Sequence, residues 1–157
     1  MSSIKIYNTP FEVGVRALMI IIKYDKGIDL DSIIILDYLS LHANVVNYEF
    51  KSLHPDNPFH GIELFSKRNV IKESINLLIR KGLIDIEFSD KGIIYLSNSI
   101  TKYFLSFFEG KYFNDLNCNI DNIVEKFKSY TQEDLQKYIN NNLETCGGQN
   151  IYTASIK

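Results

Sequence analysis

The chain has 157 residues, of which 45% are hydrophobic, 13% aromatic and 23% charged. This length predicts one compact domain, with at most a helical appendage, and a core that needs no disulfide or metal. Lys and Arg number 17 against 19 Asp and Glu, a net charge of −2, which argues against a nucleic-acid binder that depends on bulk positive charge.

The first predicted helix begins at Pro10. Thr9 can cap it, Pro10 suits its first position, and Glu12 completes a capping box. Lys26-Gly27 is expected to end it. Apolar residues at helical spacing form the expected core-facing stripe, namely Phe11, Val15, Leu18 and Ile22.

A second helix is predicted from the cap Asp29 to about Leu41. Its apolar residues nearly encircle it, as in a helix that is buried between neighbours. The run Ile33–Leu36 could instead be a short buried strand, but the cap and the length favour a helix. Asp37 stands alone among these apolar residues, and we expect either an ion pair with Arg16 or simple exposure.

Residues 43–61 break the helical pattern with several Asn, Pro and Gly residues. A connection of about 19 residues is long for a compact domain, and long ordered loops often carry function. We therefore expect a partner contact here, made by Ser52, Leu53, His54 and Phe59.

A third helix is predicted to start between Ile62 and Ser66 and to run to Lys81, where Gly82 is placed for a left-handed cap. The alternating segment 83–88, the turn 89–92 and the segment 93–96 then predict a β-hairpin.

Helical spacing resumes from Ile100 to Phe108, and Gly110 is expected to end that helix. Two more helices are predicted at 120–130 and 132–143, the second capped by Thr131. Between 103 and 113 the aromatic residues are unusually many for one short segment, so some of them are expected to anchor a partner. The candidate anchors are Phe104, Phe107, Phe108, Tyr112 and Phe113.

The element order predicts a mostly α fold with a small β-hairpin, typical of a winged helix-turn-helix-like domain with a C-terminal helical extension. The expected division is a winged-helix-like domain at 1–98, a helical extension at 99–144 and a flexible tail at 145–157.

The third predicted helix carries the one concentrated positive patch in the sequence. Between Ser66 and Gly82 there are five basic residues against Glu73 alone. Asn and Arg side chains can read base edges, and a wing can contact the DNA backbone. The candidate DNA contacts are Lys67, Arg68, Asn69, Lys72, Asn76, Arg80 and Lys91. An ordinary solvated helix face stays open as the alternative.

No set of residues forms an active-site pattern, so no enzyme, cofactor or metal is predicted. His42, His54, His60 and Asp56 lie in or beside the long connection, but their spacing matches no standard zinc site. The sequence has no phosphate-binding glycine motif.

We expect a cytoplasmic protein that does not bind membranes. No apolar stretch approaches the 18 residues of a membrane span, and Met1–Tyr7 lacks the apolar core of a signal peptide. Cys118 and Cys146 are expected to stay reduced.

Five short motifs occur in a fixed order: Asn8–Leu18, then Leu30-Asp31 with Leu36–Leu39, then Ser52–Pro55, then Arg80–Ile84, then Gly92–Tyr95. Their order and spacing resemble the small middle component of bacterial ABC-three-component systems, the group that includes Lamassu-type anti-phage operons. The resemblance covers roughly residues 6–110.

The resemblance implies a non-catalytic accessory subunit of an anti-phage defence complex. Its implied partners are an SMC- or Rad50-like ABC ATPase and an effector nuclease, which it would bridge somewhat as a kleisin does, with DNA as a further contact within the complex. A free-standing winged-helix transcriptional regulator, a homodimer that reads DNA with Asn69, Asn76 and Arg80, is the alternative.

Overall fold

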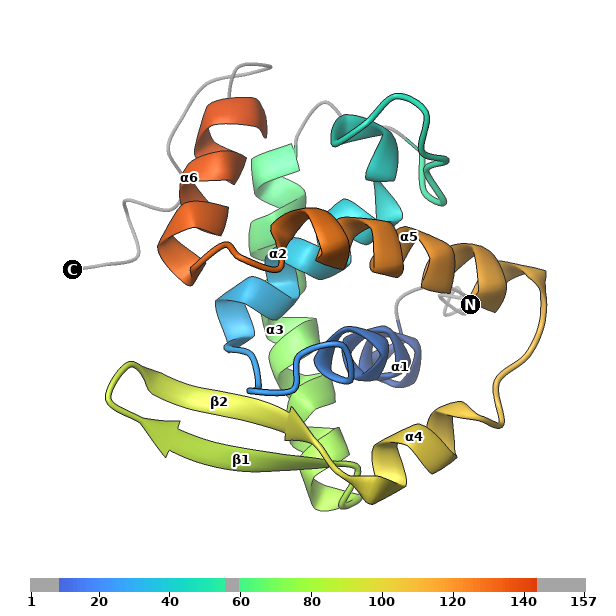
Figure 1. Ribbon diagram of the computed structural model, residues 1–157, viewed down its shortest axis with the longest axis vertical. Helices are drawn as coiled ribbons and strands as arrows, with labels where there is room; N and C mark the ends of the chain where they lie inside the picture. The colour runs from blue at the N-terminus through green and yellow to red at the C-terminus, as the bar shows by residue number, and fades with distance from the viewer. Residues whose placement is uncertain (1–8, 56–59, 144–157) are drawn as a thin grey trace, which may run out of the picture.

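The computed structural model describes residues 9–55 and 60–143. Within these ranges it contains six α-helices, one 3₁₀ turn and one two-stranded antiparallel sheet (Figure 1). In chain order the elements are α1 Pro10–Ile21, α2 Leu30–Leu41, the 3₁₀ turn Ala43–Val45, α3 His60–Arg80, β1 Ile84–Ser89, β2 Gly92–Ser97, α4 Ser99–Leu105, α5 Lys111–Phe127 and α6 Gln132–Leu143. The predicted mostly α fold with a small hairpin is confirmed.

Helix α2 is the centre of the core. Every residue from Ser32 to Leu41 is buried, and the helix contacts α1, α3, α5 and α6. Asp29 caps it as predicted, because the Asp29 carboxylate accepts a hydrogen bond of 2.9 Å from the backbone N–H of Ser32. A helix that is apolar on all sides needs neighbours on all sides, and the other helices supply them (Figure 1).

Local capping signals correctly located the starts of α1 and α6 and the end of α3. Thr9 Oγ1 accepts from the Glu12 N–H at 3.3 Å. Thr131 and Asp134 cap the start of α6 reciprocally, at 3.2 and 2.9 Å. Gly82 ends α3 with a φ of +70°, as predicted. These contacts involve residues three apart and depend little on the rest of the fold.

Several predicted boundaries were wrong. Helix α1 ends at Ile21 rather than near Lys26, and α3 begins at His60, before the predicted start. Helix α4 ends at Leu105, and Gly110 precedes α5 instead of closing the previous helix. Helix α5 begins at Lys111, not at Ile120.

The early start of α5 has a clear packing reason. Its first turns contain several Asn and Asp residues, which have low intrinsic helix propensity. Their apolar neighbour Leu116 is nonetheless buried, on the same stripe as Ile120 and Ile123, where α5 packs on α2. Burial of this stripe stabilises the helix beyond what local propensity predicts.

The hairpin β1–β2 turns through Asp90 and Lys91, with Ser89 opposite Gly92. On the inner side, Tyr95 of β2 exchanges two backbone hydrogen bonds with Ile28, at 2.9 and 3.0 Å. Three helices followed by a hairpin are therefore present; the finer assignment to a winged helix-turn-helix, and the division into domains at 98 and 144, stay predictions. The predicted tail lies outside the described residues.

No helix in the described part of the chain is both long enough and apolar enough to cross a membrane.

Gly27 provides a test of how tightly the hairpin packs on the body. Its φ is +80°, and a Cβ at this position would lie 2.3 Å from Ile94 Cγ2. We expect Gly27→Ala to lower the free energy of unfolding by about 2–5 kcal/mol, from backbone strain and overpacking together. Gly82→Ala is the matched control: its φ is +70° but no atom lies within 4 Å, so strain alone predicts about 1–2 kcal/mol. Urea unfolding measures both, and equal losses would contradict the packing argument.

Candidate functional site

The site is built around a buried ion pair between α1 and α2. Arg16 Nε donates to Asp37 Oδ1 at 2.6 Å, and Arg16 Nη2 donates to Asp37 Oδ2 at 3.2 Å. The two side chains are only 5% and 2% exposed. Of the two expectations for Asp37, the ion pair with Arg16 is confirmed. A side-on bidentate pair fixes both the distance and the orientation of the two helices.

The electrostatics of this pair follow from its surroundings. Burial alone would raise the pKa of Asp37, but the charge and hydrogen bonds of Arg16 outweigh it, so the pKa lies below its ordinary value. Burial likewise opposes the charge on Arg16, and the Asp37 carboxylate reverses that effect and raises the pKa of Arg16. Both groups are therefore charged at neutral pH.

Three further polar side chains, those of His42, Glu63 and Lys67, join the end of α2 to the start of α3. His42 Nε2 donates to Glu63 Oε1 at 3.2 Å, and Lys67 Nζ lies 3.2 Å from the same oxygen. Lys67 Nζ also lies 5.6 Å from the centre of the Tyr38 ring. Burial would raise the pKa of Glu63, but the His42 hydrogen bond and the Lys67 charge together lower it to about 2.

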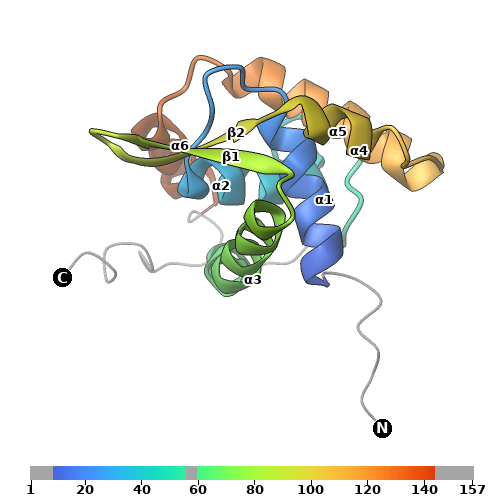
Figure 2. The ribbon, with the colours of Figure 1, turned by 90° about the horizontal axis from the view of Figure 1, so that it is seen from below.

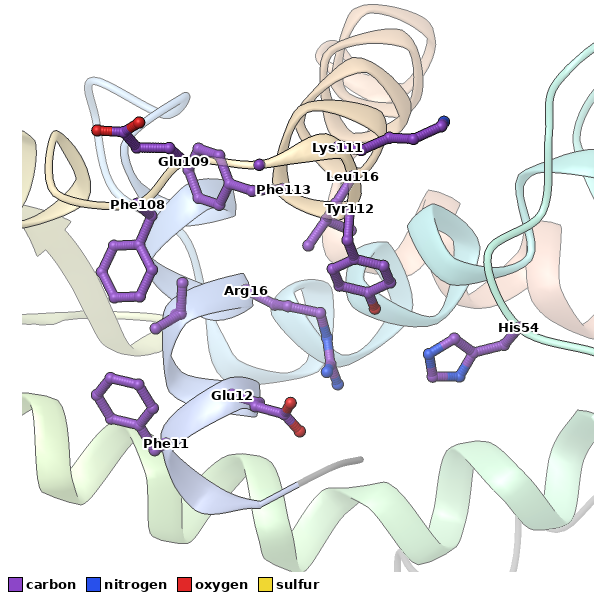
Figure 3. A pocket seen from close by; sticks show the side chains of 12 residues that line it. Phe11, Glu12, Arg16, His54, Phe108, Glu109, Lys111, Tyr112, Phe113 and Leu116 are labelled. Atoms are coloured by element: carbon purple, nitrogen blue, oxygen red, sulfur yellow. The ribbon is translucent and has the colours of Figure 1, made fainter. Parts of the chain in front are cut away.

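A cavity of about 380 Å³ opens next to Arg16. Its walls come from the start of α1, from His54 and from the α4–α5 junction. Figure 3 shows Glu12, Arg16, His54 and Tyr112 turned toward the same space. The rings of Phe11, Phe108 and Phe113 lie together to the left of these polar side chains. Burial, together with the positive charges of Lys67 and Arg16, lowers the pKa of His54, so its imidazole is neutral at neutral pH.

Next to the cavity lies the aromatic surface, which we define as Phe11, Tyr103, Phe104, Phe107, Phe108, Tyr112 and Phe113. Phe108 is its hub, with ring centres 6.2 Å from Phe11, 5.3 Å from Phe104 and 5.9 Å from Phe113. Tyr103 and Phe107 contact each other edge to face at 5.1 Å and are 67% and 66% exposed.

Phe11 corrects an expectation. The helical spacing predicted it in the core stripe, yet it is 55% exposed. It lines the cavity beside Arg16 and also a second cavity of about 320 Å³ between α1, α3 and α4. The i, i+4 pattern could not distinguish core from rim, because it does not show that Phe11, in the first turn of α1, lies between two cavities rather than against a packed neighbour.

The residues of the long connection that were predicted to contact a partner lie in different surroundings. The backbone N–H groups of Leu53 and His54 both donate to Leu41 O, at 2.9 and 3.2 Å, and Leu53 packs on the core. Ser52 Oγ donates to the side chain of Asn44. His54 faces the cavity, and Phe59 lies outside the described residues. Their role in an interface stays a prediction.

Asn119 of α5 holds this connection in place, and sequence reasoning missed it. Its Nδ2 donates to Ser40 O at 3.1 Å and to Lys51 O at 2.8 Å. One buried amide thus ties α5 to the end of α2 and to the connection. An Asn on the apolar stripe of an amphipathic helix was the signal that could have indicated it.

The predicted DNA-contacting residues of α3 divide into two groups. Lys67 is 12% exposed and pairs with Glu63, while Arg68 pairs with Asp31 of α2. Exposed positions are occupied by Asn69, Lys72, Asn76 and Arg80, and Lys91 is exposed in the hairpin turn. Contact of these residues with DNA stays a prediction.

Among the residues that the structure describes, no three His, Cys, Asp or Glu side chains form a group that could hold a metal ion. His42 and His54 stack edge to face at 6.1 Å, but Asp56 lies outside those residues. Cys118 is an exposed free thiol.

Fold and site together define a small, mostly helical protein whose main features are a buried ion pair, an aromatic surface and a cavity between them. A model of the family "ABC-three component (ABC-3C) system Middle Component 2" matches residues 6–149. The chain therefore belongs to this family, and it is a middle component of an ABC-three-component system. Comparison with curated proteins and with solved structures gives no match.

The Arg16–Asp37 pair can be tested by double substitution. Arg16→Met or Asp37→Leu alone should lower the free energy of unfolding by about 3–5 kcal/mol, because each leaves a buried charge without its partner. The double variant should lose clearly less than the sum of the two. Asp115→Asn, in the exposed pair of Lys111 and Asp115, is the control and should leave the urea midpoint unchanged. Additive losses would show that the two charges are not coupled.

Proposed function

We propose that this middle component is a non-catalytic accessory subunit that bridges an SMC- or Rad50-like ABC ATPase and an effector nuclease of an anti-phage system. The observation that carries the proposal is the aromatic surface. Phe11 is 55% exposed and its ring contacts the half-buried ring of Phe108. Tyr103 and Phe107, at the end of α4 that leads to Phe108, are 67% and 66% exposed and contact each other. Contiguous exposed apolar surface on a small protein marks a contact site, and aromatic residues are enriched in interfaces.

The cavity beside Arg16 supports the same proposal. It is continuous with the aromatic surface through Phe11, Phe108 and Phe113. Its one buried cation is already paired with Asp37, and His54 is neutral, whereas Glu12 Oε2 is buried and accepts no hydrogen bond from the described residues. The cavity therefore suits an apolar side chain that carries a hydrogen-bond donor at its tip. An anchor residue of a partner that enters this cavity would contact the start of α1, His54 and the α4–α5 junction.

We expect the chain to co-purify with the ATPase and effector components encoded beside it. The double variant Tyr103→Ser/Phe107→Ser should bind those components at least about tenfold more weakly, because it removes two exposed interface rings and no core contact. Affinity is measured by titration of the purified components. Ile62→Ser is the matched control: Ile62 is 57% exposed in the first turn of α3.

The outcomes separate two questions. A chain that forms no complex with either component would contradict the accessory function. A complex whose affinity the double variant leaves unchanged would contradict only the assignment of the aromatic surface as the contact.

A contribution to DNA sensing, or the alternative of a free-standing regulator, is favoured by one observation. The exposed positions of α3 carry Asn69, Lys72, Asn76 and Arg80 with only Glu73 as an opposing charge. A winged helix-turn-helix would present this helix to the major groove. The hairpin supports the idea less, because its three acidic residues outnumber Lys91.

If α3 contacts DNA, the isolated chain should bind duplex DNA with steep salt dependence. Lys72→Ala should weaken binding uniformly across sequences and reduce the salt slope by about 1, whereas Arg80→Ala should also relax sequence preference. Lys111→Ala, on α5, is the control and should change neither. Fluorescence anisotropy at several salt concentrations measures both, and no binding at moderate salt would remove the regulator alternative.

A further inference from the structure

The hairpin presents an open backbone edge. Tyr95 directs its N–H and C=O toward Ile28, so it makes no ladder bonds with Ile86, its opposite residue on β1. In an antiparallel pair, hydrogen-bonded and non-hydrogen-bonded residues alternate. The backbone polar groups of Ile84, Ile86 and Phe88 therefore point away from β2. Among the described residues, β1 pairs with no strand other than β2.

The apolar side chains of this strand also become exposed toward the tip of the hairpin. The strand register places the side chains of Ile84, Ile86 and Phe88 on one face of the hairpin. Tyr95 and Ile93 of β2 lie on the same face, opposite Ile86 and Phe88. That face starts buried, at Ile84 and Tyr95, and becomes exposed outward: Ile86 is 39%, Ile93 44% and Phe88 80% exposed. The hairpin tip projects past the helices (Figure 2). An exposed, apolar edge strand is a template for another strand.

The opposite face of β1 determines which strand would fit. It carries Asp85 and Glu87, and Asp90 follows in the turn, with Lys91 as the one basic residue of the hairpin. Like charges directly opposite one another destabilise a strand pair, and opposite charges stabilise it. A strand with Lys or Arg opposite Asp85 and Glu87 is thus complementary.

A second copy of β1 is a poor match by the same rule. Antiparallel self-pairing centred on Ile86 places Asp85 of each copy opposite Glu87 of the other. Self-pairing centred on Glu87 places the two Glu87 carboxylates opposite each other. Both of these registers bring acidic side chains together without a basic neighbour.

We propose that β1 is a strand-addition site for a partner protein: an extended segment, apolar at alternate positions and basic between them, pairs with the exposed part of the outer edge, Asp85–Phe88. Main-chain hydrogen bonds would supply the affinity, and Phe88, Ile86 and the two carboxylates the specificity. This inference rests on the proposed function, since the segment belongs to another component of the system. It adds a contact that is separate from the aromatic surface.

The test uses the full chain with the ATPase and effector components encoded beside it. Ile86→Pro removes an N–H that points outward, a position where edge strands tolerate proline, so the hairpin should still form. Ile86→Ala is the matched control, because it loses the side chain but keeps the N–H. The proline variant should bind at least about tenfold more weakly than the alanine variant. Glu87→Lys should also weaken binding, through charge reversal.

Amide hydrogen exchange gives a readout that does not depend on a variant folding. In the free chain the amides of Ile86 and Phe88 should exchange faster than those of Asp85 and Glu87, which bond to β2. In the complex these two outward amides should slow by at least about tenfold. The Lys91 N–H donates to Ser89 Oγ within the turn at 3.2 Å, so the Lys91 amide serves as an internal reference.

The results of the binding and exchange measurements distinguish the strand-addition site from the accessory function. A complex that forms with unchanged exchange at the amides of Ile86 and Phe88, or with equal affinity for the proline and alanine variants, overturns the strand-addition site and leaves the accessory function standing. Protection that depends only on the concentration of the chain itself identifies a second copy as the occupant and overturns the proposed partner. The absence of any complex overturns the accessory function and this inference with it.

Discussion

The side-on ion pair between Arg16 and Asp37 joins the two helices on which the other elements pack. Helix α2 is buried on all sides, so a carboxylate in its middle has no access to water and needs a cation within hydrogen-bonding distance. Arg16 supplies it with two bonds, and this fixes the rotation of α1 about its own axis. Because Phe11 and Glu12 lie about one turn earlier on α1, the same constraint positions the wall of the cavity and one edge of the aromatic surface.

The polar contacts near this pair connect segments that are far apart in sequence. His42, Glu63 and Lys67 join the end of α2 to the first turns of α3, while Asn119 joins α5 to α2 and to the connection that carries His54. Each buried polar group is costly without a partner, so these contacts favour one arrangement of the helices over others that bury similar apolar area. The apolar core stabilises the fold, and the polar contacts specify it.

The surface divides into regions of different chemistry. The outer positions of α3 are basic and amide-bearing, the hairpin is acidic and apolar at its tip, and α4 with the start of α5 is aromatic. A net charge of −2 describes none of these regions. The chain of a middle component thus carries three chemically distinct surface regions on one small body.

The sequence by itself determined the helical class, the hairpin, the caps at Thr9, Asp29 and Thr131, the left-handed Gly82, and the family resemblance, because each depends on contacts within a few residues or on motif order. It also offered Arg16 as a partner for Asp37 but left simple exposure open. Only the tertiary structure decided that α5 begins at Lys111, and that Phe11 is largely exposed whereas Lys67 is largely buried. It also decided that Ile28 pairs with β2, so that β1 is the outer strand of the hairpin. The physical reason is that burial and strand pairing depend on neighbours brought together from distant parts of the chain, which local spacing does not encode.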